Sequence, residues 1–373
     1  MVSIDDCMRL ENYLRNSRGE HVAFFDIGTR AVRLLVGPKH VPVEEWRRNS
    51  FCNLGQILNL GDDLCPISQT IDLAQSRKMQ ELYDFMRTLK GILEDHNLAD
   101  ADVSAIGTAV FRWLENQPDV LEEIEREAGI RVNVLSAADE AMLTLQAIGH
   151  TYPFRHNNAY GGLSENDAIL LLDQGGGSME VSYLMTGRGQ EVQTHTFDGL
   201  GTIALRQEFF DTDDMESETW VADRIAHIQE FIASKINSWE GYSEVSEMNL
   251  HAYGMGAAIT NCVSGSNYSI HNQVVDCQML LEDAGAAVAQ LASMGKQLRH
   301  LGETLHERES GEYLELERLL DRVYGPPVYV RVLKKFGLSH LRICGYGLRY
   351  GAYVWQNYIG RSLADLSNCA APA

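Results

Sequence analysis

The segment "LLLDQGGGSMEV", residues 170–181, combines a strand pattern with a run of three glycines. An apolar run ends at Asp173, glycines occupy 175–177, and a second β-rich run begins at Ser178. Because glycine has no Cβ, a glycine turn at a strand end exposes consecutive backbone N–H groups. Such N–H groups form a concave site for an anion. The segment therefore predicts a strand–turn–strand unit whose turn binds phosphate.

A second segment repeats this design. "HVAFFDIGTRAVRLLVG", residues 21–37, also places an aspartate, Asp26, at the end of an apolar run and a glycine, Gly28, in the turn. Two such units about 150 residues apart indicate a duplicated α/β architecture of two domains.

The rest of the chain alternates helical and strand patterns. They predict helices over 76–96, 119–129, 136–150 and 277–298, strands over 103–108 and 131–135, a loop and then a helix over 211–236, and strand–turn–helix units over 250–263 and 341–359. The polar segment 151–167 is expected to be a surface connection.

The net charge restricts the partners. The 373 residues carry a formal charge of -21, and the estimated pI is about 4.9. Such an acidic chain is a poor binder of nucleic acid and repels a polyanion unless a cation or a local basic patch reverses the charge. The seven cysteines include no CxxC pair, which favours reduced thiols. With no apolar run long enough for a membrane span and no signal-peptide pattern at the start, a cytoplasmic protein is expected.

An aspartate beside a phosphate-binding turn needs a cation between the two negative groups. Asp26 and Asp173 in these turns therefore predict Mg²⁺ as the cofactor. Taken alone, the turn at Gly28 is more often a plain hairpin whose glycine only satisfies positive φ, and for the turn at 175–177 the two alternatives are evenly balanced. Two turns in the same strand context favour phosphate binding.

Several segments in the same order resemble the exopolyphosphatase / guanosine pentaphosphate phosphohydrolase (Ppx/GppA) family of the actin-like ATPase superfamily. The resemblance covers most of 21–355. Besides the two turns, the matching segments are "IGTAVFRWLEN" (106–116), "VLSAADEAML" (134–143), "GLGTIALRQEFF" (199–210) and "GLRYG" (347–351). The resemblance implies two ribonuclease-H-like domains facing an interdomain cleft. These are 1–138, with a C-terminal helix at about 348–373 packing back onto it, and 139–347.

The resemblance also implies roles for single residues. Glu140 matches the family's water-activating base, although acids are common in first helical turns for reasons of the helix dipole alone. Asp26, Asp173 and Glu180 are the candidate metal ligands, Glu180 having the alternative of pointing outward from a strand. The candidate phosphate-binding residues are Gly28, Thr29, Arg30, Arg112, Gly175, Gly176, Gly177, Ser178 and Arg349. The alternative for both Arg112 and Arg349 is an ordinary surface ion pair.

The chain departs from the family pattern at Thr29–Arg30–Ala31 in the first turn, at Met142, where the family has arginine, and at Tyr350, where it has glutamate. The function expected is Mg²⁺-dependent release of terminal phosphate from inorganic polyphosphate or a pppGpp-like nucleotide. Arg30 and the arginine missing at 142 favour an alternative, a catalytically weak sensor of a guanosine alarmone. A third alternative is an actin-like kinase. A homodimer is expected from the family resemblance alone.

Overall fold

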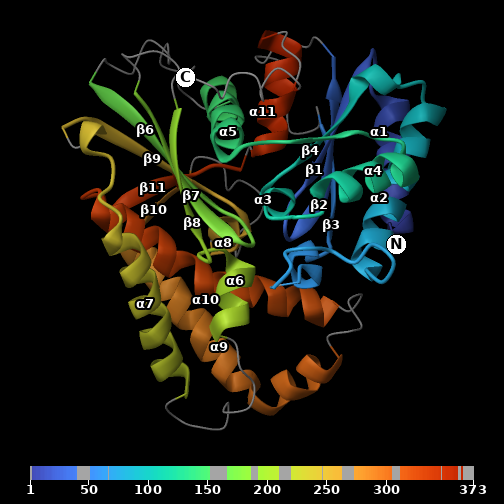
Figure 1. Cartoon of the computed structure of the whole chain (residues 1–373). Coiled ribbons are helices and arrows are strands. Elements are labelled where there is room, and N and C mark those ends of the chain that lie inside the picture. Colours follow the sequence, from blue (N-terminus) through green and yellow to red (C-terminus); the bar gives the residue numbers. More distant parts are fainter. Residues whose placement is uncertain are drawn as a thin grey trace. The chain divides into compact units, whose positions relative to one another are not determined.

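The computed structural model describes residues 2–39, 51–65, 67–151, 166–185, 192–209, 220–245, 247–262, 273–304, 311–345, 347–359 and 363. The chain forms two compact units. Unit 1 consists of Met1–Tyr160 and Tyr346–Ala373, and unit 2 consists of Gly161–Gly345. Each unit is built around its own sheet (Figure 1).

The sheet of unit 1 has the strand order β3-β2-β1-β4-β5. Its strands are β1 (His21–Ile27), β2 (Ala31–Pro38), β3 (Cys52–Ile57), β4 (Val103–Gly107) and β5 (Val132–Val134). The first three strands form an antiparallel meander, whereas β4 pairs parallel to β1 and β5 parallel to β4. The carboxyl ends of β1, β4 and β5 therefore lie at one edge of the sheet.

Helices cover both faces of this sheet (Figure 1). One face packs against α1 (Ile4–Asn16), α2 (Arg77–Asp95) and α4 (Gln117–Ala128). The other face packs against α5 (Ala137–Thr151) and α11 (Leu348–Val354). A short α3 (Ala109–Arg112) follows β4, η3 (Leu60–Asp63) and η4 (Asp100–Asp102) are single 3₁₀ turns, and η7 (Trp355–Ile359) is a π-helical turn.

Unit 2 contains a six-stranded sheet with the order β10-β11-β9-β6-β7-β8. Its strands are β6 (Asp167–Gln174), β7 (Ser178–Met185), β8 (Val192–Asp198), β9 (Asn249–Met255), β10 (Val274–Asp276) and β11 (His340–Ile343). Its helices are α6 (Thr202–Phe209), α7 (Trp220–Ser238), α8 (Ala257–Cys262), α9 (Cys277–Thr304) and α10 (Gly311–Lys335), with a 3₁₀ turn, η6 (Ser243–Val245). Alternate residues of β6 and β7 enter a core that these helices complete.

The predicted duplication is confirmed. In unit 2, β8-β7-β6-β9-β11 repeats the arrangement β3-β2-β1-β4-β5 of unit 1, with β10 added at the edge. The two glycine turns occupy equivalent places, between β1 and β2 and between β6 and β7. The chain therefore has the expected α/β class, with two ribonuclease-H-like units.

The division between the units differs from the boundary expected at 138/139. It lies between Tyr160 and Gly161, so α5 belongs to unit 1. The physical reason is the packing of α5 on α11, where the Cα of Gly351 lies so close that an added Cβ would be 1.9 Å from the Leu143 carbonyl oxygen. Of the C-terminal helix expected at 348–373, the structure describes 348–359 and 363. Most of the expected connection 151–167, and the loop before α7, lie outside the described residues.

Within the described ranges, no helix combines the length and the apolarity that a membrane span requires.

Candidate functional site

The carboxyl edge of the sheet in unit 1 brings three candidate segments together. The first glycine turn follows β1, Arg112 follows β4, and Glu140 follows β5. Backbone hydrogen bonds tie the three strand ends: Thr108 N–H donates to the Ile27 oxygen (3.2 Å), and Leu135 N–H donates to the Gly107 oxygen (3.0 Å). Parallel strands thus place residues from three distant parts of the sequence at one edge.

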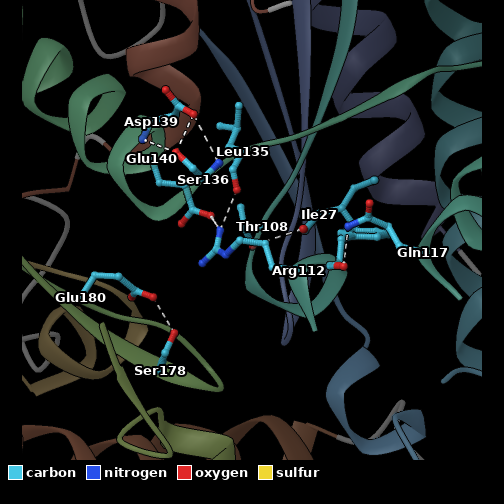
Figure 2. Close-up of polar contacts among 11 residues, drawn as sticks. Ile27, Thr108, Arg112, Gln117, Leu135, Ser136, Asp139, Glu140, Ser178 and Glu180 are labelled. Carbon is cyan, nitrogen blue, oxygen red and sulfur yellow. Dashed lines mark hydrogen bonds and ion pairs between the residues drawn. The ribbon is translucent and has the colours of Figure 1, made fainter. Parts of the chain in front are cut away.

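Arg112 and Glu140 form an ion pair at this edge (Figure 2). The Arg112 Nη1 atom donates to a Glu140 carboxylate oxygen and also to the backbone oxygen of Leu135, at 2.9 Å. The two side chains are 22% and 14% exposed, so the pair is largely shielded from solvent. The sequence singled out both residues, and the structure brings them into contact.

Helix α5 begins with a reciprocal cap that orients Glu140. Ser136 Oγ accepts from Asp139 N–H (3.1 Å) and donates to the Asp139 carboxylate (2.6 Å). Asp139 is thereby a capping residue. The Asp139 side chain is buried in this cap, whereas the next side chain, Glu140, contacts Arg112.

The turn at 28–30 is held from behind by the segment after β3. Leu58 and Asn59 N–H groups donate to the Arg30 oxygen (2.9 and 2.7 Å), and Gly61 N–H donates to the Thr29 oxygen (3.1 Å). Thr29 and Arg30 are 6% and 8% exposed. In a trans peptide group the N–H points opposite to the preceding C=O. Fixing the Thr29 carbonyl therefore also fixes the direction of the Arg30 N–H.

The turn at 175–177 is held in the same way by the start of α6. Thr202 N–H donates to the Gly175 oxygen (3.0 Å), Ile203 N–H to the Gly176 oxygen (2.8 Å), and Gly199 N–H to the Gly177 oxygen (3.0 Å). The N–H groups of Gly176 and Gly177 must then point away from α6. Within the described residues these two N–H groups have no hydrogen-bond partner. Two adjacent N–H groups of this kind form an anion site.

The glycines of the two turns are not explained by backbone conformation. Gly28 and the glycines 175–177 do not have positive φ, unlike Gly199 (φ 81°) and Gly256 (φ 104°). The positive φ that the plain-hairpin alternative expects is therefore absent at these four glycines. Close packing does not require glycine at 28 or 175 either, since an added Cβ would lie 3.5 and 3.8 Å from the nearest atoms. The close approach is at Gly201, where a Cβ would lie 2.3 Å from the Gly176 carbonyl.

Asp26 lies next to two arginines. Arg349 Nε is 3.8 Å from the Asp26 carboxylate, and Arg33 is the cross-strand neighbour of Asp26 in the β1–β2 ladder. Burial raises the pKa of the Asp26 carboxyl, and the charges of Arg349 and Arg33 lower it. Burial, followed by the charge of Arg33, lowers the pKa of Arg349 to about 10. These surroundings suit an ion pair better than direct ligation of a metal by Asp26.

In unit 2 a more suitable donor set for Mg²⁺ lies beside the second turn. Asp173 and Glu180 are directly opposite each other in the β6–β7 ladder, and Ser178 Oγ donates to the Glu180 carboxylate at 2.6 Å (Figure 2). Two adjacent carboxylates repel unless a cation lies between them, and Mg²⁺ binds through one or two carboxylates with water and substrate phosphate. No cluster of three or more His, Cys, Asp or Glu side chains suited to a metal occurs among the residues described.

Two residues of this region were not predicted from the sequence. Arg33 could have been predicted from the strand pairing alone, because a hairpin closed over 28–30 places residue 33 opposite residue 26. Lys78 is buried at the start of α2 and contacts the segment behind the first turn. No local pattern identifies Lys78, because its partners lie in another element.

Comparison with known proteins agrees with this geometry. The sequence model of the Ppx/GppA phosphatase family matches residues 54–356. The chain belongs to the Ppx/GppA phosphatase family. Ppx/GppA relatives include exopolyphosphatase 1 of Mycobacterium tuberculosis and of Mycobacterium bovis, each 32% identical over 113 residues. That segment is 30% of this chain and 29% of the length of those relatives.

Solved Ppx/GppA structures share the fold. The Aquifex aeolicus family member superposes with a TM-score of 0.63 at 18% identity, over 92% of this chain and 99% of that one. An exopolyphosphatase from Cytophaga hutchinsonii gives a TM-score of 0.64 at 18% identity, over 92% and 99% of the two chains. At this identity the likeness concerns the fold. The metal ligands and the catalytic role of Glu140 stay predictions, as does the interdomain cleft.

Proposed function

We propose that this protein is a Mg²⁺-dependent phosphohydrolase that releases the terminal phosphate of inorganic polyphosphate or of a pppGpp-like nucleotide, with Glu140 activating water. The observation that carries the proposal is the meeting of the first glycine turn, Arg112 and Glu140 at the carboxyl edge of one sheet. Family membership supports a phosphohydrolase, and the names of the mycobacterial relatives support polyphosphate as a substrate class.

The residues of unit 1 have distinct tasks in this proposal. The turn at 28–30, held in place from behind, contacts the phosphate, while its Gly28 N–H already donates to the Ala31 oxygen (2.9 Å). Arg112 holds the Glu140 carboxylate in one orientation and places its positive charge beside the substrate. Glu140 accepts a proton from the attacking water at a carboxylate oxygen. Phosphoryl transfer depends chiefly on such positioning and charge stabilisation.

In unit 2 the adjacent N–H groups of Gly176 and Gly177 provide a second phosphate contact, and Asp173 and Glu180 are the residues that would hold Mg²⁺. When bound, the ion would neutralise charge on the phosphate oxygens. This requirement follows from the chain's own charge of -21, which otherwise opposes binding of a polyanion.

The test is phosphate release from polyphosphate and from pppGpp, with and without Mg²⁺, by wild type and Glu140→Gln. Loss of a general base lowers kcat by about 100-fold or more. Glu122→Gln, an exposed change of the same kind on α4, is the matched control and should behave as wild type. Equal rates for Glu140→Gln and wild type would remove the role of Glu140. No release from either substrate would overturn the function.

One observation favours the alternative of a weakly active alarmone sensor. The Glu140 carboxylate is engaged by Arg112, so an attacking water must compete with the guanidinium for the carboxylate oxygens. Tight ppGpp or pppGpp binding in calorimetry, with no phosphate released over hours, would select the sensor. Turnover of a bound nucleotide would exclude it.

A further inference from the structure

Lys78 is a buried cation with three oxygen partners. Its Nζ atom donates to the Asn59 backbone oxygen (2.7 Å) and to the Asp62 carboxylate (2.9 Å), and lies 3.3 Å from the Asp63 carboxylate. The side chain is 6% exposed. A lysine is rarely buried to this degree unless it is paired. Asp63 in addition accepts from Ser76 Oγ (2.6 Å), the N-cap residue of α2.

These partners belong to the segment that holds the first glycine turn. Leu58, Asn59 and Gly61 donate their N–H groups to the turn carbonyls, and Lys78 binds the same segment through the Asn59 oxygen and two carboxylates. The segment and the turn are closely packed, since a Cβ on Gly61 would lie 2.6 Å from Thr29 Cγ2. Asn59 is also held in the left-handed region, at φ 53°. The segment 58–63 is therefore clamped between Lys78 and the turn.

We propose that Lys78 is a positioning residue for the phosphate-binding turn at 28–30. By fixing the segment 58–63, it fixes the carbonyls of Thr29 and Arg30, and with them the position of the turn. The kinetic part of this inference rests on the proposed phosphohydrolase function. The structural part, that Lys78 immobilises the turn, does not.

The experiment compares Lys78→Met with Lys90→Met. Lys90 is on the same helix and pairs with Glu94 (2.8 Å) and Asp100 (3.3 Å), away from the segment 58–63, so it is the matched control. Asp62→Asn is a milder second variant, which keeps Lys78 but weakens one of its contacts. The first readout is hydrogen exchange at the amides of Asn59 and Gly61, and the second is KM and kcat for phosphate release from polyphosphate with Mg²⁺.

We expect faster exchange at both amides in Lys78→Met and Asp62→Asn, and no change there in Lys90→Met. A displaced phosphate-binding group lowers kcat/KM by about ten- to a hundredfold. Because the turn binds phosphate in ground and transition state alike, the loss should come mainly from KM. If Lys78→Met does not fold, Asp62→Asn gives the same two readouts.

Two results would overturn the inference. One is Lys78→Met matching Lys90→Met in both exchange and KM. The other is a fall in thermal stability and kcat with unchanged KM, as for a residue that only supports the fold. If wild type releases no phosphate, the proposed function is wrong, and exchange alone then decides whether Lys78 immobilises the turn.

Discussion

At the scale of single residues, Arg112 holds two groups of unit 1 at once. One guanidinium nitrogen contacts both the Leu135 carbonyl and the Glu140 carboxylate. Arginine presents five donors in a planar fork, whereas a lysine ammonium is a point charge on a flexible stem. The geometry of Glu140 thus depends on the shape of the arginine as well as on its charge.

Arg112→Lys should lower kcat/KM for phosphate release by about ten- to a hundredfold, because a misoriented catalytic carboxylate costs about that much. Steady-state kinetics measure the change. Arg126→Lys is the control, since Arg126 is exposed and pairs only with Glu123 and Glu127 in the described structure. Full activity of Arg112→Lys would show that charge alone is sufficient at this position.

His21 gives a prediction about pH. Its ring packs against Tyr13, with centroids 5.7 Å apart, and its buried Nε2 has no hydrogen-bond partner among the residues described. Burial, and next the nearby His96, lowers the pKa of His21 below its usual 6.5. Below pH 6.5 the unfolded chain therefore binds this proton more readily than the folded chain does. The free energy of unfolding decreases as the pH is lowered.

His21→Phe should reduce the stability lost between pH 7 and pH 5, while preserving the ring contact. Urea midpoints at the two pH values measure the difference. The exposed His340→Phe serves as control and should leave the pH dependence as in wild type. An unchanged slope in His21→Phe would contradict the assignment.

The sequence identified the candidate site residues that belong to a motif. It missed those whose importance depends on a contact with a distant part of the chain. Glu140 and Arg112 came from the family resemblance, and their ion pair required the parallel pairing of β4 and β5. Lys78 has no motif: it follows a serine cap in an ordinary amphipathic helix, and its partners precede it by up to 19 positions.

At the scale of elements, both glycine turns are fixed by N–H groups behind them, and in unit 2 this depends on close backbone approach. Gly201→Ala would place a Cβ 2.3 Å from the Gly176 carbonyl and so push the turn away from α6. We expect kcat/KM to fall by about tenfold or more. Gly285→Ala, a helical change into open space, is the control. Unaltered kinetics in Gly201→Ala would mean that the turn tolerates displacement.

The packing of α11 on α5 gives a second pair of variants. A Cβ at Gly351 would overlap the Leu143 carbonyl, so Gly351→Ala should destabilise unit 1 by about 2–3 kcal/mol. Gly91→Ala, on α2 with nothing within 4 Å, should instead stabilise by about 0.5–1 kcal/mol. Chemical denaturation measures both, and equal midpoints for the two variants would contradict the packing argument.

The elements that the sequence predicted were those with strong periodicity, such as α2, α5 and the two hairpins. Helix α10 was not predicted, and its "YGPPV" stretch (324–328) has the composition of a turn. There the helix continues because almost every residue around Pro326 and Pro327 is buried, including Tyr324, Val328 and Tyr329. Tertiary burial overrides local propensity, and local patterns cannot reveal it.

At the scale of the whole molecule, unit 1 is discontinuous in sequence. Its second core face combines Phe24 and Leu35 of the sheet with Leu143 of α5 and with Tyr353 and Trp355 from the end of the chain. The sequence predicted a C-terminal return onto this domain but divided the chain before α5. Only the observed α5–α11 packing shows that the two helices form one layer.

Truncation after Gly345 should therefore unfold unit 1 selectively. The loss exposes the apolar face formed by Phe24, Leu35 and Leu143. Hydrogen exchange should show lost protection in β1 and β2 with retained protection in β6 and β9, and binding of a hydrophobic dye should rise. Uniform loss in both units would instead mean that they fold as one cooperative body.

The late return of the chain to unit 1 also bears on its synthesis. Unit 2 is one uninterrupted stretch, so a nascent polypeptide can complete it as soon as Gly345 leaves the ribosome. Unit 1 begins to emerge before unit 2 yet lacks part of its interior until the segment Tyr346–Ala373 appears. Unit 2 can therefore finish folding before unit 1, whose apolar face stays exposed to solvent in the meantime.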